Sequence, residues 1–230
     1  MDEIISGSLF FGLTLTFGAY LVGCAVHRKV KTPLLNPLIT TNVIVIAFLA
    51  FSGVSYESYN MGARYIGDLL TPATVCLAIP LYRQLRLLRS NARAICCGIL
   101  AGAAANIVSV FAVALLAGLE HSAYATLLPK SITAAIGMKL SEELGGVAAI
   151  TMLATVITGA FGYLSAAPLL KLLRVTDPVA KGVAIGTSSH AFGTVKAFEM
   201  GEAEGAMSSL AIAAAGLVTV AVAPLAALLL

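Results

Sequence analysis

The residues best suited to chemistry lie in one stretch, Ile185–Glu202, which reads IGTSSHAFGTVKAFEMGE. Ser188, Ser189 and Thr194 offer hydroxyl donors there, and His190 offers an imidazole that titrates close to neutral pH. Hydroxyl groups and a titratable ring can bind an anion without the cost of burying a permanent charge. The pattern therefore favours binding of a small anion, with proton movement at His190 as a further prediction.

Two further stretches carry similar groups. The segment Leu69–Tyr82 reads LLTPATVCLAIPLY, and its prolines cannot donate backbone hydrogen bonds. In Leu127–Thr133, LLPKSIT, a cation and two hydroxyl residues follow a proline. Broken backbone of this kind survives in a membrane only where it is buried in protein or lines a wet cavity. The candidate substrate-binding residues are Thr71, Pro72, Thr74, Lys130, Ser131, Thr133, Ser188, Ser189, His190, Gly193 and Thr194.

Each assignment has a simpler alternative. His190 could instead be a structural histidine bonded to a neighbouring carbonyl, and Lys130 could instead extend to the lipid headgroups. No hydrolytic triad, phosphate-binding loop, zinc-binding helix or nucleotide fingerprint occurs in the sequence. The cysteines also lack the spacing of metal ligands. We therefore expect no catalytic residue, no metal and no cofactor.

The composition indicates that helices in a membrane position these groups. Of the 230 residues, 59% are hydrophobic and 11% are charged, whereas an ordinary globular domain has about 25% charged residues. The sequence predicts an all-α polytopic membrane protein with about seven transmembrane helices plus a re-entrant segment. Five charge-free runs exceed the roughly 20 residues that cross a hydrocarbon core: Ile4–Val26, Thr32–Tyr56, Ala94–Leu119, Leu144–Leu170 and Gly205–Leu230.

The order of the apolar runs predicts two related halves. A long, a short and a long run occur twice, and the connections Arg83–Arg93 and Glu199–Glu204, which correspond, have opposite charge. Opposite charge predicts opposite orientation, the 3+3 inverted repeat with two broken helices that secondary transporters use. The expected parts are a peripheral N-terminal transmembrane helix at 1–31, repeat 1 at 32–119 with a broken helix at 69–82, a re-entrant linker at 120–143, and inverted repeat 2 at 144–230 with a broken helix at 182–199.

The basic residues predict the orientation, because Lys and Arg near span ends mark the cytoplasmic side. The clusters in His27–Thr32, Arg83–Arg93 and Lys171–Lys181 are placed inside, and Glu199–Glu204 is placed outside. The N-terminus is then outside and the C-terminus cytoplasmic, in a bacterial plasma membrane. Because the basic residues form short clusters between spans, we expect contact with the lipid bilayer and none with nucleic acid.

Six motifs spread along the chain are distinctive: PLLNPL (Pro33–Leu38), GVSYESY (Gly53–Tyr59), LLTPATVCLAIPLY (Leu69–Tyr82), LLPKSIT (Leu127–Thr133), SEELGG (Ser141–Gly146) and GTSSHAFGT (Gly186–Thr194). Together they resemble the LrgB/CidB family of bacterial membrane proteins, which includes antiholin-like LrgB and is related to the plastidal glycolate/glycerate translocator.

The resemblance implies two competing functions. One is a transporter of small monocarboxylates such as glycolate, glycerate or pyruvate, with or without proton coupling at His190. The alternative is a non-transporting, antiholin-like regulator of murein hydrolase export and cell lysis, and a passive channel is a third reading. The resemblance also implies a separate LrgA/CidA-like membrane partner. Self-association in the family, with the small-residue helix faces, predicts a homo-oligomer, specifically a dimer.

Overall fold

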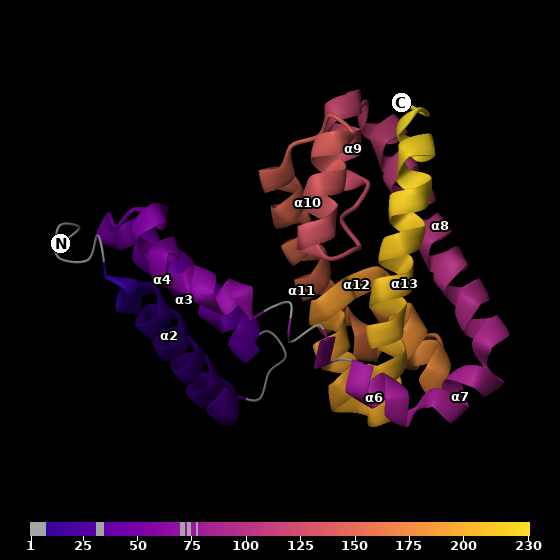
Figure 1. Ribbon diagram of the computed structural model, residues 1–230, viewed down its shortest axis with the longest axis horizontal. Coiled ribbons are helices and arrows are strands. Elements are labelled where there is room, and N and C mark those ends of the chain that lie inside the picture. Colours follow the sequence, from indigo (N-terminus) through magenta and orange to yellow (C-terminus); the bar gives the residue numbers. More distant parts are fainter. Residues whose placement is uncertain (1–7, 31–34, 70–71, 73–74, 77) are drawn as a thin grey trace. The chain divides into compact units, whose positions relative to one another are not determined.

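The structure is a computed structural model that describes residues 8–30, 35–69, 72, 75–76 and 78–230 (Figure 1). These residues form helices and connecting turns with no strand among them, so the all-α prediction is confirmed. The chain divides into two compact units, Met1–Cys76 and Leu77–Leu230, and each is described by itself. Within the described part, the helices long and apolar enough to cross a membrane are fewer than the seven or so expected: Leu9–Val30, Ala92–Ala117, Ala148–Leu172 and Glu202–Ala227.

The described helices of the first unit are α2 (Leu9–Val30), α3 (Pro37–Ser52) and α4 (Tyr56–Asp68). Helices α2 and α4 cross at Gly12 and Gly62, where a Cβ atom on either glycine would collide with the backbone of the other helix. At the same crossing, Thr16 Oγ1 lies 2.9 Å from Tyr59 Oη. Small residues therefore allow the two helices to approach closely, as in other membrane helix pairs.

Helix α3 is shorter than predicted. The charge-free run Thr32–Tyr56 predicts a full span, but α3 has 16 residues, which reach about 24 Å of the roughly 30 Å required. Asn36 caps its start, since the side-chain oxygen accepts a hydrogen bond from the Leu38 backbone N–H at 2.8 Å. Gly53 ends it in the left-handed conformation, with φ of 70°. Caps, rather than the first and last charged residues, set the length of this helix.

The described helices of the second unit are α6 (Ala78–Arg83), α7 (Leu85–Ser90), α8 (Ala92–Ala117), α9 (His121–Leu127), α10 (Ala134–Glu143), α11 (Ala148–Leu172), α12 (Pro178–Met200) and α13 (Glu202–Ala227). Helices α8 and α13 run in the same direction. Ile95 near the start of α8 shares a buried cluster with Ala206 near the start of α13, and Ala114 near the end of α8 shares another with Ala226.

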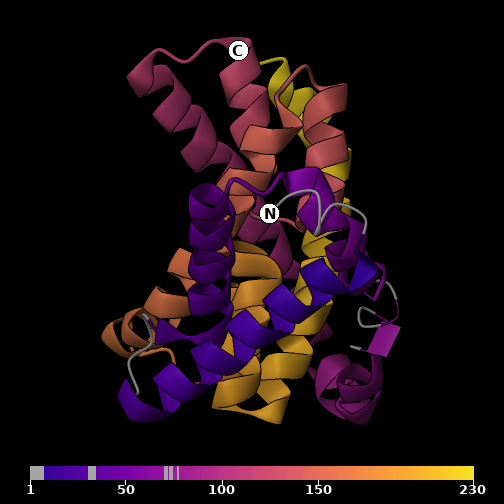
Figure 2. The same cartoon turned by 90° about the vertical axis from the view of Figure 1, so that its left-hand side faces the viewer.

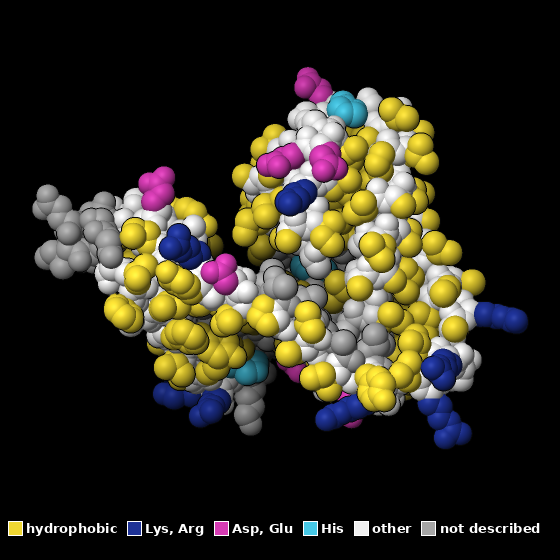
Figure 3. Space-filling view, in the orientation of Figure 1, with side chains coloured by type: hydrophobic (Ala, Val, Ile, Leu, Met, Phe, Trp, Pro, Cys, Tyr) yellow, Lys and Arg dark blue, Asp and Glu magenta, His cyan; other side chains and the backbone are white. Residues whose placement is uncertain are grey.

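The two ends of the second unit are distinct. We call one the arginine end, because α6, α7 and the start of α8 carry Arg83, Arg86, Arg89 and Arg93 there. We call the other the C-terminal end, where α9 packs against the end of α13. On the face shown in Figure 3, charged side chains gather near these ends and hydrophobic ones cover the flank between them. An apolar flank between polar ends is the distribution that a bilayer requires.

Helix α12 is a hairpin of two antiparallel arms that turns at His190. Its backbone is non-helical at this one residue, with φ of 41° and ψ of −136°. Ile185 on the first arm and Ala197 on the second share a buried cluster with Ala166 of α11, although a straight helix would separate Ile185 and Ala197 by about 18 Å. In both views α12 occupies the lower half of the unit, whereas α13 runs its full height (Figures 1 and 2).

Both arms of the α12 hairpin return to the arginine end. Lys181 Nζ on the first arm lies 3.9 Å from Glu204 Oε1 of α13. Directly after the second arm, Glu202 Oε1 lies 3.8 Å from Arg83 Nη1 of α6. The prediction that Glu199–Glu204 lies on the opposite side from Arg83–Arg93 is therefore wrong. The prediction fails because α12 turns at His190 and returns the chain to the arginine end, whereas a straight helix would have carried it to the opposite end.

Helices α9 and α10 form a second hairpin, which enters from the C-terminal end. Its base is closed by His121 at the start of α9, whose Nε2 lies 3.0 Å from the carbonyl oxygen of Leu144 after α10. Residues Leu128–Thr133 join the arms, and Asn106 in the middle of α8 donates a hydrogen bond to the Leu128 carbonyl at 3.0 Å. The turn therefore reaches the interior of the unit. Insertion of this segment, 120–143, into a membrane from one side stays a prediction.

A helix followed by a hairpin thus occurs twice, in opposite directions. Helix α8 runs from the arginine end to the C-terminal end and is followed by the α9–α10 hairpin. Helix α11 starts at the C-terminal end, where the Val147 backbone N–H donates to Thr126 Oγ1 at 2.8 Å, and it is followed by the α12 hairpin. The returning arms share only a weak pattern, an alanine followed five residues later by a lysine, in AAIGMK from Ala134 and AFGTVK from Ala191.

This arrangement corrects two predictions. Ala94–Leu119 and Gly205–Leu230 are not inverted counterparts, because α8 and α13 run in the same direction. Three helices, α8, α11 and α13, pass between the ends, so the arginines and the C-terminus lie at opposite ends and cannot both be cytoplasmic. The predicted broken helix at 69–82 lies partly outside the described residues, which exclude 70–71, 73–74 and 77.

Candidate functional site

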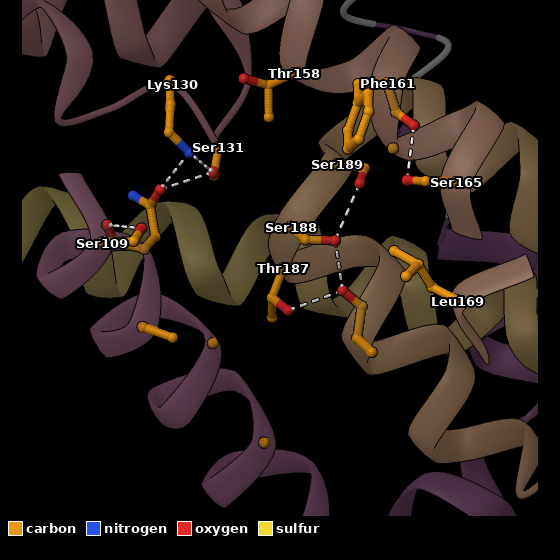
Figure 4. A pocket seen from close by; sticks show the side chains of 16 residues that line it. Ser109, Lys130, Ser131, Thr158, Phe161, Ser165, Leu169, Thr187, Ser188 and Ser189 are labelled. Atoms are coloured by element: carbon orange, nitrogen blue, oxygen red, sulfur yellow. Dashed lines mark hydrogen bonds between the residues drawn. The ribbon is translucent and has the colours of Figure 1, made fainter. Parts of the chain in front are cut away.

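A pocket of about 640 Å³ lies in the second unit, where the turns of the two hairpins approach each other (Figure 4). Asn106 and Ser109 of α8 form one wall, and Lys130 and Ser131 come from the turn of the α9–α10 hairpin. Helices α11 and α12 supply the remaining polar side chains of the described lining: Thr158, Ser165, Thr187, Ser188 and Ser189. The site therefore combines both hairpins with the two helices that precede them.

The cationic side of the pocket is organised by Asn106. The Lys130 ammonium donates hydrogen bonds to Asn106 Oδ1 at 3.0 Å and to Ser131 Oγ at 3.3 Å (Figure 4). Ser131 Oγ in turn donates to Asn106 Oδ1 at 2.8 Å. An ammonium carries three hydrogens, so one of them remains available to a ligand.

Hydroxyl groups of α12 line the other side of the pocket (Figure 4). Ser188 Oγ donates to the Ala184 carbonyl at 2.8 Å and lies 3.0 Å from Ser189 Oγ. Thr187 Oγ1 donates to the Val183 carbonyl at 2.9 Å. Ser188 is exposed, whereas Thr187 and Ser189 are buried. Because a hydroxyl hydrogen can rotate, the accessible Ser188 can redirect its hydrogen from its own helix to an anion.

Glycines of α8 and α11 make room for the α12 hairpin. A Cβ atom on Gly162 would collide with the Ser189 side chain, and one on Gly102 would lie 2.7 Å from Thr187 Oγ1. A Cβ atom on Gly159 would lie 2.5 Å from the His190 ring. These three positions are therefore closed to any larger side chain unless the hairpin moves away.

The charge of the site is positive. Among the described residues that line the pocket, Lys130 is the one charged side chain. The ion pairs found in the described part of the chain lie elsewhere: Arg83–Glu202, Lys181–Glu204 and Lys196–Glu199. A partly buried cation without a carboxylate partner, surrounded by hydroxyl groups, suits a ligand with one negative charge. Within the residues described, no three His, Cys, Asp or Glu side chains converge to hold a metal.

Comparison with known proteins identifies the family. The model of the LrgB-like family matches residues 16–229. The chain belongs to this family. Proteins named antiholin-like protein LrgB from Bacillus cereus (strain B4264) and Bacillus anthracis (strain A0248) are each 38% identical to it over 217 residues, which cover 94% of this chain and 94% of each relative. No solved structure matches the chain. The family resemblance inferred from the motifs is confirmed, and this LrgB-family chain is a multi-pass bacterial membrane protein.

Four residues singled out from the sequence line the pocket of this LrgB-family protein: Lys130, Ser131, Ser188 and Ser189. Thr133 is instead the residue before α10 and caps it without a side-chain hydrogen bond. Gly193 packs against Ser189 on the facing arm of α12. Thr194 Oγ1 donates to the His190 carbonyl at 3.0 Å and lies 2.7 Å from Ser208 Oγ of α13. These last three residues shape the hairpins rather than the pocket wall.

His190 lies at the turn of α12 but not in the pocket lining. It is buried, and its Nε2 lies 2.9 Å from the Thr155 carbonyl oxygen of α11. Since a carbonyl only accepts, Nε2 is the donor. Phe192 packs against the ring at 6.1 Å between centroids, with the two planes at 90°. This is the contact expected of a structural histidine, and the role of His190 in substrate binding or proton coupling stays a prediction.

The three candidates from Leu69–Tyr82 are not placed at the pocket. Thr71 and Thr74 lie outside the described residues, and Pro72 belongs to the first unit, where it is exposed. Their part in substrate binding therefore stays a prediction.

The sequence reasoning missed several pocket residues. Asn106 of α8 and Thr158, Ser165 and Leu169 of α11 line the pocket but are absent from the candidate residues inferred from the sequence. A signal was present, because Thr158, Gly162, Ser165 and Leu169 recur at intervals of three or four residues and so share one face of a helix. Polar and small residues on one face of an otherwise apolar membrane helix mark a face turned to protein or water.

Proposed function

We propose that this LrgB-family protein is a transporter of small monocarboxylates, with 2-hydroxy or 2-oxo acids such as glycolate, glycerate or pyruvate as the substrate class. The observation that carries the proposal is the unneutralised ammonium of Lys130 in a hydroxyl-lined pocket inside an apolar helical bundle. The carboxylate would accept from Lys130, and the 2-oxygen would contact the hydroxyls of α12, above all Ser188.

The size and shape of the site support a small-molecule function. A volume of about 640 Å³ falls within the roughly 300–1,000 Å³ of typical ligand sites. Two hairpins that enter from opposite ends and meet at one pocket resemble the broken helices of secondary transporters, which hold substrate near the bilayer midplane. Alternate movement of one hairpin, then the other, would open the pocket to each side in turn.

The orientation follows from the arginines. Placing the arginine end in the cytoplasm satisfies the positive-inside rule and puts the C-terminus outside, because three helices pass between the two ends. A C-terminal tag accessible to protease in intact cells is expected. A tag cut only after cell lysis would contradict this orientation.

A second candidate function is suggested by the relatives, which are named antiholin-like protein LrgB. In this alternative the protein regulates murein hydrolase export and cell lysis without transporting a substrate. It would then tolerate neutral changes in the pocket, since regulation would depend on its outer surfaces. An LrgA/CidA-like membrane partner and a homodimer are proposed for either function. Proton coupling through His190 is part of the transport proposal.

Uptake by purified protein in liposomes separates the functions. We expect saturable uptake of labelled glycolate or pyruvate by the wild-type protein, measured with and without a pH gradient. Each labelled acid is competed against an excess of its unlabelled primary amide, which lacks the charge. The transport proposal expects strong competition by the acid and weak competition by the amide. Absence of uptake for every acid tested, with cell-lysis phenotypes intact, would favour the regulator.

A further inference from the structure

We propose that Asn106 is the positioning residue that keeps the pocket selective for an anion, because it holds Lys130 in place without neutralising its charge. This inference rests on the proposed transport function and goes beyond it by assigning charge selection to one side chain of α8. The residue lies in the middle of α8, within the charge-free run Ala94–Leu119, where a polar side chain needs a partner.

The hydrogen bonds of Asn106 fix which way its amide faces. Its Nδ2 donates to the carbonyl oxygen of Leu128, a fully buried residue at the hairpin turn, at 3.0 Å. Its Oδ1 accepts from Lys130 Nζ at 3.0 Å and from Ser131 Oγ at 2.8 Å. A flipped amide would place an NH2 group against the ammonium and against the serine hydroxyl hydrogen. The amide therefore has one orientation, and both oxygen lone pairs are used.

The neutral amide has a consequence for the ligand. A partly buried ammonium is stable only with oxygen partners, and a carboxylate would be the strongest. A carboxylate at position 106 would form an ion pair with Lys130 and leave the pocket with no net charge. Asparagine supplies the same oxygen without the charge, so the positive charge of Lys130 remains for the substrate. Ser131 completes the arrangement, since it accepts from Lys130 and donates to Asn106.

The test replaces Asn106 by its charged isostere. Asn106→Asp keeps the shape of the side chain, adds a negative charge beside Lys130 and loses the donor to Leu128. The matched control is Asn91→Asp directly before the same helix and outside the pocket lining, where the Asn91 side chain donates to the Leu87 carbonyl and to Ser90 Oγ. An aspartate is favoured before a helix, so the control is expected to fold normally.

We expect Asn106→Asp to raise the KM for glycolate or pyruvate uptake about 10- to 100-fold, the range for a lost charge-assisted hydrogen bond, and to reduce the preference for the acid over its primary amide. Asn91→Asp should keep the wild-type KM within about twofold. A merely structural role would lower the amount of folded protein and the maximal rate while leaving KM and the acid-to-amide preference unchanged. That result would overturn the proposal.

A second variant tests the inference if Asn106→Asp does not fold. If Asn106→Asp is not recovered from membranes, Asn106→Ser takes its place, because its shorter side chain cannot reach both Lys130 and the Leu128 carbonyl. We expect a KM increase of at least about threefold, and an unchanged KM overturns the inference. If the wild-type protein takes up the acid and every Asn106 variant keeps the wild-type KM, the role of Asn106 is wrong while the transport function stands. If the wild-type protein shows no uptake, both the transport function and this inference are wrong.

Discussion

The α9–α10 hairpin and the α12 hairpin reach the same pocket by different constructions. The first turns through Leu128–Thr133 and offers a long cationic side chain, Lys130, anchored by a neighbouring helix. The second turns at a single residue, His190, and offers short hydroxyl side chains on a helical arm. A charge-assisted hydrogen bond is roughly twice as strong as a neutral one. The first hairpin should therefore contribute most of the affinity for an anionic ligand, and the second should contribute the shape of the pocket.

The largest expected effect comes from removing the charge of the first hairpin. Lys130→Met keeps much of the apolar stem but deletes the ammonium that faces the pocket. Loss of one charged hydrogen bond, worth about 1.5–3 kcal/mol, should reduce uptake efficiency about 10- to 100-fold. Initial rates of labelled glycolate or pyruvate uptake in liposomes measure this directly.

Lys139→Met is the matched control for that experiment. Lys139 lies on α10 of the same hairpin but not in the described pocket lining, and it should retain wild-type uptake. Equal loss in both variants would show that general destabilisation of the hairpin, rather than the charge at the pocket, explains the effect of Lys130→Met.

The next largest effect should come from the contact between α11 and the α12 hairpin. Gly162→Ala introduces a methyl group that collides with the Ser189 side chain, and overpacking of this kind costs about 1–3 kcal/mol. We expect a lower thermal midpoint in detergent and a reduced uptake rate, because the α12 turn must move away from α11.

Gly216→Ala provides the comparison for Gly162→Ala. On α13, the new methyl group would lie 3.7 Å from Ile136, an ordinary contact, and alanine favours a helix by up to about 1 kcal/mol over glycine. Its thermal midpoint should stay the same or rise. If Gly162→Ala behaves like Gly216→Ala, the close packing of α11 against the α12 turn is incorrect.

Much of the architecture was accessible from the sequence, for definite physical reasons. Low charge and long apolar runs predicted membrane helices, and the cost of burying Lys130 and several serines marked them as candidate site residues, which line the pocket. The direction of the chain could not be predicted from the sequence, because a charge-free run has the same composition whether the chain crosses the membrane or turns back within it. The 14 charge-free residues between Lys181 and Lys196 therefore gave no sign that both ends of α12 return to one side.

The orientation of individual side chains was also beyond sequence reasoning. His190 attracted attention as a titratable group, yet its ring bonds to the Thr155 carbonyl, and the residue serves as the turn itself. Asn106 was not recognisable as a site residue, because nothing in AGAAANIVSV shows that Lys130, 24 residues later, contacts it. Contacts of this kind depend on the hairpin turn, which local patterns do not determine.

The smallest of these effects concerns the turn at His190. Both His190→Gly and His190→Ala lose the hydrogen bond to Thr155 and the ring packing against Phe192. Glycine adopts positive φ without strain, whereas alanine does not, so only His190→Ala should keep the backbone strain as well. The difference should be about 1 kcal/mol in favour of His190→Gly, measured by thermal midpoints. Equal midpoints would contradict a structural role for the turn.

The same pair of variants sharpens the question of proton coupling. If His190 carries a proton, both variants lose stimulation of uptake by a pH gradient, whatever their stability. If the histidine acts only as the turn, His190→Gly keeps that stimulation.

The central claim, that both hairpin turns line one substrate pocket, is tested most directly by substrate protection. Single cysteines replace Ser131 or Ser188 in a protein whose Cys24, Cys76, Cys96 and Cys97 have been changed to alanine. A small thiol reagent should label both positions, and saturating glycolate or pyruvate should slow labelling at both to a similar degree. Protection at one turn only, or at neither in protein that transports the acid, would contradict the account.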